Sequence, residues 1–144
     1  MSRDLLTVSG LTRLHQRMFD QTWRWAGKFR TSDTNIGVSW HQAASMVQAL
    51  CDDAVYQAEN TMYPWDELAT RFHHRLVAIH PFPNGNGRHA RLATDLLLSQ
   101  HGQPLFTWGS ASLIAGSTTR QEYLTALQAA DRENYETLLG FVRS

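Results

Sequence analysis

The sequence has little of what defines several large classes of protein. Its 144 residues include one cysteine, Cys51, which excludes an internal disulfide and a thiolate metal cluster. Thirteen basic and thirteen acidic side chains cancel, so no overall field attracts nucleic acid or an anionic membrane. No stretch approaches the roughly 20 apolar residues of a membrane span, and the N-terminal segment lacks the apolar run of a signal peptide. We therefore expect a cytoplasmic protein that binds neither nucleic acid nor membrane.

Helical periodicity dominates the chain, and internal repeats are absent. Apolar residues recur every three or four positions, which predicts helices over about 11–26, 41–59, 64–80, 88–101, 119–130 and 138–142. The length is sufficient for one core and short for two, so residues 1–144 are expected to form a single domain.

One segment departs from this helical pattern. Residues 29–40 read FRTSDTNIGVSW, with a polar, turn-forming centre followed by an extended-looking stretch from Ile36 to Trp40. We expect a small β-hairpin flap over about 31–40. The predicted fold class is therefore all-α, a helical bundle with this flap as its only β structure.

Two local patterns give more detail about the later helices. Leu92, Leu96 and Leu97 are expected to form the apolar face of the helix that ends near Gly102. Thr119 and Glu122 have the spacing of a capping box, which predicts that Thr119 begins the next helix.

The segment with the most chemical content is HPFPNGNGRHAR, residues 80–91, between two predicted helices. Gly85, Asn86 and Gly87 immediately precede a helix, so their backbone N–H groups can converge on an anion that the helix dipole also favours. Arg88 and Arg91 are three positions apart on that helix and can hold phosphate oxygens with permanently charged guanidinium groups.

His80 lies at the start of the same segment, at the end of the preceding helix. An imidazole with a pKa near neutrality is the usual group for taking a proton from a hydroxyl nucleophile. A base, a phosphate-binding loop and an arginine pair together predict phosphoryl or nucleotidyl transfer, in which positioning and charge neutralisation supply most of the catalysis.

These residues resemble the signature of the Fic family, which is histidine, any residue, phenylalanine, any residue, an acidic residue, Gly-Asn-Gly-Arg, two free positions and arginine. Only the acidic position departs, because it is Asn84; the matching residues are His80, Phe82, Gly85, Asn86, Gly87, Arg88 and Arg91. The similarity extends to WRWAGKFR before the flap and to Arg120 with Tyr123 in a later helix, and covers about 11–142.

The resemblance implies a protein adenylyltransferase, which transfers AMP from ATP to a Tyr, Ser or Thr hydroxyl of a target protein. Carried over by position, His80 is the general base and Phe82 the buried anchor of the loop. The implied catalytic residues are His80, Asn86 and Arg88. The implied nucleotide-binding residues are Gly85, Asn86, Gly87, Arg88 and Arg91. The flap, with Asn35, Ile36, Gly37 and Val38, would align the target by edge-strand pairing.

In the family, the acidic residue of the motif holds Mg²⁺, so Asn84 is a weak candidate ligand for Mg²⁺ or Mn²⁺. An amide oxygen can bind a hard cation but lacks the charge of a carboxylate, which implies altered metal dependence. Asp95 could supply a carboxylate, although a surface pair with Arg91 is the simpler role for it. A site built from His73, His74 and His80 is a further alternative, but it lacks partner acids at ligand spacing.

Two other functions remain open at this point. One is a kinase-like toxin that moves the γ-phosphate on the same scaffold, although the intact Gly-Asn-Gly step argues against it. The other is a catalytically silent nucleotide-binding or interaction module. The inhibitory helix of many Fic proteins has no match in the sequence, since Ala129 occupies the Ser/Thr position before Glu133 and Asn134. Inhibition is therefore expected from a separate antitoxin-like partner or from a longer natural chain, or is absent.

Overall fold

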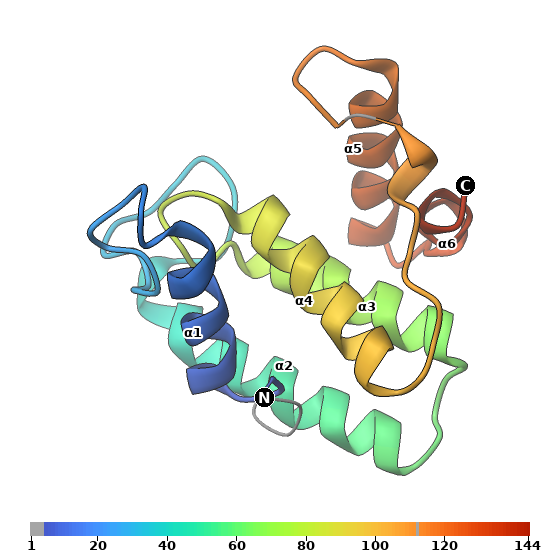
Figure 1. Cartoon of the computed structure of the whole chain (residues 1–144), viewed down its shortest axis with the longest axis horizontal. Coiled ribbons are helices and arrows are strands. Elements are labelled where there is room, and N and C mark those ends of the chain that lie inside the picture. The colour runs from blue at the N-terminus through green and yellow to red at the C-terminus, as the bar shows by residue number, and fades with distance from the viewer. Residues whose placement is uncertain (1–4, 112) are drawn as a thin grey trace.

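The computed structural model describes residues 5–111 and 113–144, and helices and loops account for all of this range (Figure 1). The all-α prediction is therefore confirmed. The helices are α1 (Val8–Phe19), α2 (Ala43–Glu59), α3 (Trp65–Ile79), α4 (Asn86–Gln100), α5 (Thr118–Asp131) and α6 (Glu136–Val142), with short 3-10 turns η2 (Trp40–Gln42) and η3 (Trp108–Ser110). None of these described helices has the length and apolar character needed to cross a bilayer.

Helix α3 is central because its apolar residues recur on one broad face. Leu68, Phe72, Leu76 and Ile79 have the three- and four-residue spacing that predicts this helix, and all four are at most 2% exposed. The helix follows Pro64, carries acidic residues in its first turn and stops before Pro81, because proline cannot continue a helix. It packs between α2 and α4, and Figure 1 shows α1 and α2 on one side of the α3–α4 pair and α5 and α6 on the other.

The core consists of two clusters on these two sides. The first joins residues of α1 to α4, and the second joins α5, α6 and the connector after α4 to parts of α3 and α4. Val77 on α3 packs against both clusters. A pocket that Val77 lines consequently lies where the two halves of the core meet.

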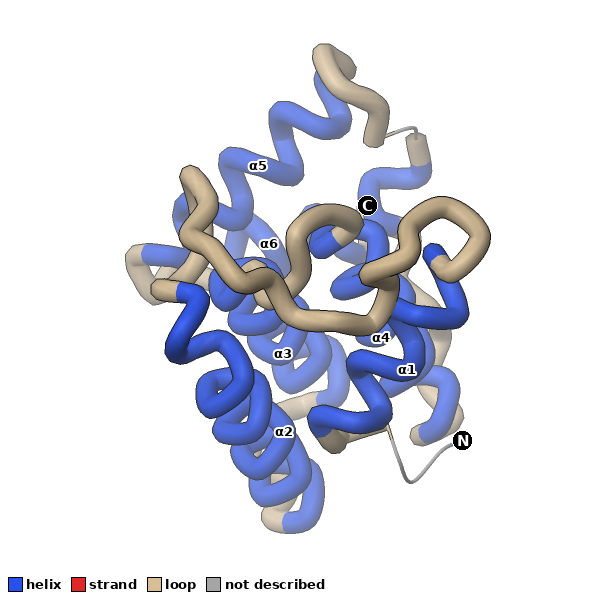
Figure 2. Tube along the Cα trace, turned by 90° about the vertical axis from the view of Figure 1, so that its left-hand side faces the viewer, coloured by secondary structure: helices blue, strands red, loops and turns tan. Residues whose placement is uncertain are grey.

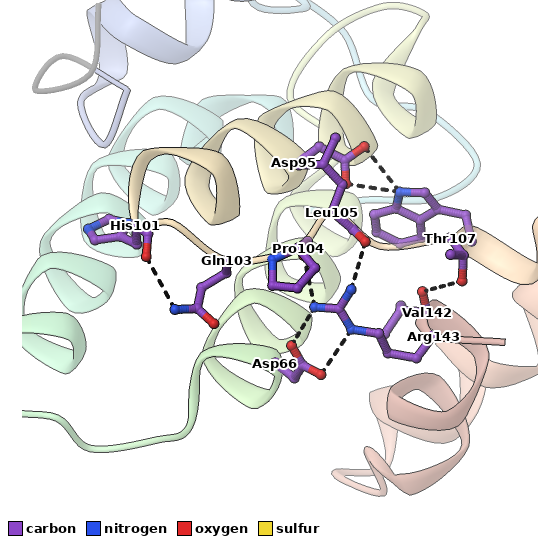
Figure 3. A network of polar contacts seen from close by, with 10 residues as sticks. Asp66, Asp95, His101, Gln103, Pro104, Leu105, Thr107, Val142 and Arg143 are labelled. Carbon is purple, nitrogen blue, oxygen red and sulfur yellow. Dashed lines mark hydrogen bonds and ion pairs between the residues drawn. The ribbon is translucent and has the colours of Figure 1, made fainter.

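A polar network fastens the C-terminal helix to the start of α3 (Figure 3). The Arg143 guanidinium donates to both oxygens of Asp66, at 3.0 and 2.7 Å, and to the carbonyls of Pro104 and Leu105. The hydrogen bonds from Arg143 lower the pKa of the Asp66 carboxyl. Thr107 donates its N–H to the Val142 carbonyl at 2.8 Å. These contacts hold the connector, α6 and, through α6, α5 in place against α3.

The first helix ends at Phe19, whereas the sequence predicts that it continues to about residue 26. The Phe19 carbonyl accepts from Thr22 and Trp23 in a turn, and the Trp23 and Trp25 rings then stack at 4.5 Å. The aromatic rings therefore fold back on α1 instead of extending its stripe.

The later helices differ from the predictions in two details. Ser117, not Thr119, caps α5, because its hydroxyl accepts from the Arg120 N–H at 3.1 Å. On α4, Leu97 is buried and Leu96 packs against the core, as predicted, but Leu92 is 38% exposed. The buried face also contains Leu98 and the small residues Ala90 and Ala93. Small side chains let α4 lie close to its neighbours. A pattern of large apolar residues does not predict this kind of buried face.

The β-hairpin prediction is also not supported, since residues 31–39 form an irregular loop and the described chain contains no strand (Figure 2). This flap loop (residues 31–39) finds its hydrogen-bond partners elsewhere. Val38 donates its N–H to the Ile79 carbonyl at 3.3 Å, and its own carbonyl accepts from the Arg30 side chain. Asp33 accepts the N–H of Trp40 at 2.8 Å. Contacts with the end of α3 thus replace the cross-strand ladder.

Candidate active site

The loop between α3 and α4 begins with a residue in an uncommon conformation. His80 is left-handed, with φ 54° and ψ 59°, and its N–H still bonds to the Leu76 carbonyl at 3.2 Å. A left-handed residue other than glycine is strained and persists only where its surroundings hold it, often at functional sites. Phe82 lies two residues further along and is completely buried, so its side chain fixes this part of the loop to the core.

Asn86 closes this loop on itself. Its side-chain oxygen accepts from the Phe82 N–H at 2.9 Å, and its side-chain amide donates to the Phe82 carbonyl at 2.7 Å. The residue is 4% exposed. The sequence predicts a catalytic role for Asn86, but both ends of its side chain are committed to Phe82. Its side chain therefore shapes the loop, and its backbone N–H lies in the first turn of α4.

His15 on α1 packs against the loop between α3 and α4 and bonds to it. Its Nδ1 accepts from the Gly27 N–H at 2.9 Å, so its Nε2 carries the proton and donates to the Asn84 carbonyl at 3.0 Å. The ring stacks on Phe82 with centroids 3.8 Å apart. Burial lowers the pKa of His15, which favours this neutral form. Sequence reasoning missed His15, although its position four residues after Leu11 places it on the buried face of α1.

Most of the predicted site residues line one pocket of about 270 Å³. Helices α3 and α5 contribute further lining, including Val77, Arg120 and Tyr123, and the flap loop contributes Ile36. The predicted residues brought together there are His80, Asn84, Gly85, Asn86, Gly87, Arg88 and Arg91. Of the other flap residues, Gly37 packs directly on His80 and Val38 bonds to Ile79, whereas Asn35 is exposed and outside the lining.

The pocket is strongly cationic. Arg88 and Arg91 from α4 and Arg120 from α5 line it, and the described lining residues include no carboxylate. Within residues 5–111 and 113–144, no ion pair involves these three arginines. Arg88 and Arg91 instead lie over the rings of Phe19 and Tyr123, at 4.8 and 5.5 Å. Three unneutralised guanidinium groups make the pocket suited to a polyanion.

Backbone donors reinforce this charge. Asn86, Gly87 and Arg88 are the first three residues of α4, where N–H groups have no partner within the helix. The helix dipole adds partial positive charge at the same end. Gly85, the residue before the helix, has φ +78°, and an added Cβ would lie 2.8 Å from the Phe19 ring. Glycine is therefore required there both by the backbone and by the packing.

His80 is the only histidine in the lining of this pocket. Burial lowers its pKa, and the positive charge of Arg30 lowers it further. The imidazole is therefore neutral near pH 7 and able to accept a proton.

The side chains present do not fit a resident divalent cation. The Asn84 oxygen already accepts from the Gly85 N–H at 2.7 Å, and the Asn86 oxygen is committed to Phe82. Asp95 accepts from the Trp108 indole N–H at 3.2 Å and is not in the pocket lining, so its predicted pairing with Arg91 is wrong. Across the described part of the chain, no three His, Cys, Asp or Glu side chains gather in a way that could hold a metal.

The other two candidate histidine ligands have separate partners. His73 is completely buried and shares a 2.7 Å hydrogen bond with the Tyr123 hydroxyl, while burial lowers its pKa to about 3. His74 lies 2.8 Å from the Asp131 carboxylate. Both histidines therefore hold α3 against α5.

Fold and site define a class: a small helical domain in which a histidine and a glycine-rich anion loop lie between two helices, faced by arginines. The chain belongs to the Fic/DOC family, whose sequence model matches residues 5–98.

Relatives agree with this assignment. The protein adenylyltransferase fic-1 of Caenorhabditis briggsae is 33% identical over 126 residues, which cover 82% of this chain and 22% of that protein. A uridine 5'-monophosphate transferase of Xanthomonas campestris is 55% identical over 38 residues, 26% of this chain and 7% of that protein. The solved structure of C. elegans Fic-1 (residues 134–508) has a TM-score of 0.78 at 25% identity, covering 95% of this chain and 39% of that one. The chain thus spans about a quarter of the length of the curated adenylyltransferases that it matches.

Proposed function

We propose that this chain is a protein adenylyltransferase that moves AMP from ATP to a hydroxyl side chain of a target protein. The observation that carries the proposal is the single pocket in which a neutral histidine, the N-terminus of α4 and three arginines meet. Membership of the Fic/DOC family and similarity to proteins named adenylyltransferases support a transferase.

His80 acts as the general base. It accepts the proton of the target hydroxyl, whose oxygen bonds to the α-phosphorus while the bond between that phosphorus and the bridging oxygen breaks. Pyrophosphate leaves with the electrons of that bond. A base near 3 Å from the hydroxyl, with a pKa near or below the working pH, suits this step.

The loop and the arginines hold the triphosphate. The first N–H groups of α4 contact phosphate oxygens, and Arg88, Arg91 and Arg120 neutralise the charge that develops on the leaving pyrophosphate. Because the pocket does not fit a resident divalent cation, we assign charge neutralisation mainly to these arginines. We expect that Mg²⁺ or Mn²⁺ affects transfer less than it would with a carboxylate at position 84.

UMP transfer is the second candidate, because a 38-residue segment of the chain is 55% identical to a uridine 5'-monophosphate transferase. The base, the anion loop and the arginines would act identically, since they face phosphates and not the nucleobase. Transfer of the γ-phosphate and a silent nucleotide-binding module are the remaining alternatives.

The partner of this function is a target protein whose hydroxyl reaches His80 past the flap loop. Ile36 is 62% exposed and also lines the pocket, so it is placed to touch an incoming segment. An antitoxin-like inhibitor would be expected to present a carboxylate to the unpaired arginines.

The test uses the purified chain, desalted cell lysate, and ATP or UTP labelled at the α or γ position, with Mg²⁺, Mn²⁺ or EDTA. Protein label from α-labelled ATP alone supports AMP transfer, and label from α-labelled UTP alone supports UMP transfer. Label from the γ position shows phosphorylation. Nucleotide binding without any protein label shows a silent module and contradicts the proposal.

A His80→Ala control identifies the base. We expect this variant to bind nucleotide with unchanged affinity and to lose transfer by about 10²–10⁴-fold, the usual contribution of a general base. Full transfer by this variant would remove His80 from the mechanism.

A further inference from the structure

Arg30 is a buried cation without a close acidic partner. The residue is 3% exposed, and its nearest described carboxylate, Asp33, lies 3.9 Å away with a side chain that is 68% exposed. An exposed pair at that distance contributes little. Burying a charged group is unfavourable unless hydrogen bonds compensate it, so the contacts of Arg30 require an explanation.

Those contacts are backbone carbonyls from two separate segments. At the end of α3, the Nε of Arg30 donates to the His80 carbonyl at 2.6 Å and one Nη donates to the Ile79 carbonyl at 3.3 Å. In the flap loop, the guanidinium donates to the carbonyls of Ser32, at 3.0 Å, and Val38. The planar fork of arginine can serve several acceptors at once, which a lysine ammonium cannot do in the same geometry.

The position is favourable for a positive charge. Ile79 and His80 lie at the C-terminus of α3, where unpaired carbonyls give the helix end a partial negative charge. The backbone of Arg30 contributes too, since its N–H donates to the Pro81 carbonyl at 3.0 Å. Three successive carbonyls, from residues 79 to 81, are therefore held by one residue.

The middle carbonyl belongs to His80, whose left-handed backbone needs support from its surroundings. The flap loop touches the same residue directly. A Cβ added to Gly37 would lie 2.6 Å from the Cβ of His80. The loop therefore lies directly against the base, and Arg30 fastens both to each other.

We infer that Arg30 is a positioning residue for the transfer reaction, because it joins the flap loop and His80 into one rigid unit. The segment that meets the target and the imidazole that accepts its proton then keep a fixed relative geometry. This inference rests on the proposed function for its role in transfer. The joining itself can be measured without any transfer.

The guanidinium also acts on the base through its charge. Arg30 bonds to the His80 carbonyl and its charge acts on the imidazole, while Arg88 and Arg91 from α4 and Arg120 from α5 line the same pocket as His80. Tyr123 is the other titratable side chain in the lining, which contains no acid. Removing Arg30 should therefore raise the pKa of His80. A change that only loosened the packing would raise this pKa as well, because burial is the larger cause of its lowering, so Arg30→Lys, which keeps the charge, separates the two effects.

The experiment compares Arg30→Met, Arg30→Lys and a control, Arg24→Met, in the full chain. Arg24 is exposed in the connection after α1 and lies outside the pocket lining. Circular dichroism checks folding, NMR measures the pKa of His80 and the hydrogen exchange of the Val38 amide, and label transfer is followed against pH.

For Arg30→Met we expect a raised His80 pKa, at least tenfold faster Val38 exchange, and an acid limb of the transfer profile moved to higher pH. We expect kcat to fall about tenfold or more, as misplaced catalytic groups do, with KM for the nucleotide within twofold. Arg30→Lys should keep the pKa of His80 but still speed Val38 exchange and lower kcat. The control should match the wild type.

A folded Arg30→Met with unchanged His80 pKa and unchanged Val38 exchange would overturn the inference. If Arg30→Met does not fold, Arg30→Lys decides: wild-type exchange and kcat would show that the fork is not needed. If the wild type transfers no label, the proposed function fails, while the two NMR measurements still decide whether Arg30 joins loop and base.

Discussion

Substitution of Gly37 tests whether the flap loop must lie against the base. Gly37 has φ +99°, and a Cβ there would lie 2.6 Å from the Cβ of His80 and 2.9 Å from the Ile79 carbonyl. Gly102 is the matched control, because it also has positive φ, +67°, but nothing lies within 4 Å of its added Cβ. Comparing Gly37→Ala with Gly102→Ala therefore separates the close approach from the backbone strain that both changes share.

The expected magnitudes follow from the geometry. Each alanine costs about 1–2 kcal/mol for a left-handed backbone. Carbon atoms in contact are best separated by roughly 3.5–4.0 Å, so at Gly37 the loop and the base must also part by about 1 Å. A misplacement of about 1 Å can reduce catalysis by roughly 10²-fold. We expect Gly37→Ala to lose transfer by about 10–100-fold and Gly102→Ala to stay within about twofold of the wild type.

Urea unfolding gives the stability of each variant, and α-labelled nucleotide gives its transfer rate. We expect both variants to remain folded in the absence of urea. Equal transfer by the two would refute the reasoning, since contact between the loop and His80 would then have no influence on the reaction.

Three further predictions concern the loop and the core. Asn84→Asp places a carboxylate beside the phosphates, so transfer should need about tenfold less Mg²⁺ for half-maximal rate; an unchanged Mg²⁺ titration would show that residue 84 does not meet the ion. Asn86→Ala orphans the N–H and carbonyl of Phe82, at about 1–3 kcal/mol each, and should lower the urea midpoint and abolish transfer. Burial lowers the pKa of His73 to about 3 and of His89 to about 4. Below about pH 6.5 these two histidines therefore bind protons in the unfolded chain but not in the folded chain. Stability should therefore fall as pH drops below about 6.5, by roughly 1.4 kcal/mol per pH unit for each histidine, until the folded pKa is reached. Equal unfolding free energies at pH 7 and pH 5 would contradict this.

The features that the sequence predicts well are those encoded by neighbouring residues. Residues 80–91 carry their own turn, their own glycines and the start of the next helix, and the structure places most of them around one pocket. The apolar spacing that predicts α3 is equally local, and the structure buries Leu68, Phe72, Leu76 and Ile79 along it. Helix ends are less well determined by the sequence. Ser117 and Thr119 can both cap α5, and only the backbone geometry of the folded chain selects Ser117.

The features that the sequence does not reveal depend on contacts between distant segments. The flap loop has the polar and extended residues of a hairpin, but the acceptors that decide its shape are on α3, about 50 positions away from Arg30. His15 likewise meets Asn84 across 69 positions. No motif surrounds His15. Arg30 is the last residue of the WRWAGKFR segment, but that segment does not reveal its carbonyl acceptors, so the contacts of both residues become visible only in the folded chain.

The unpaired arginines of the pocket affect the stability of the folded chain as well as the reaction. Arg88, Arg91 and Arg120 carry like charges in a pocket whose lining offers no acid to offset them. Their mutual repulsion is a standing electrostatic cost that any bound polyanion relieves. Binding and folding are thereby linked, because a ligand that binds only the folded chain stabilises it. The same charges that are proposed to hold the triphosphate should make phosphate, pyrophosphate or nucleotide a stabiliser of the folded chain, and high concentrations of such anions in a buffer would compete with the substrate.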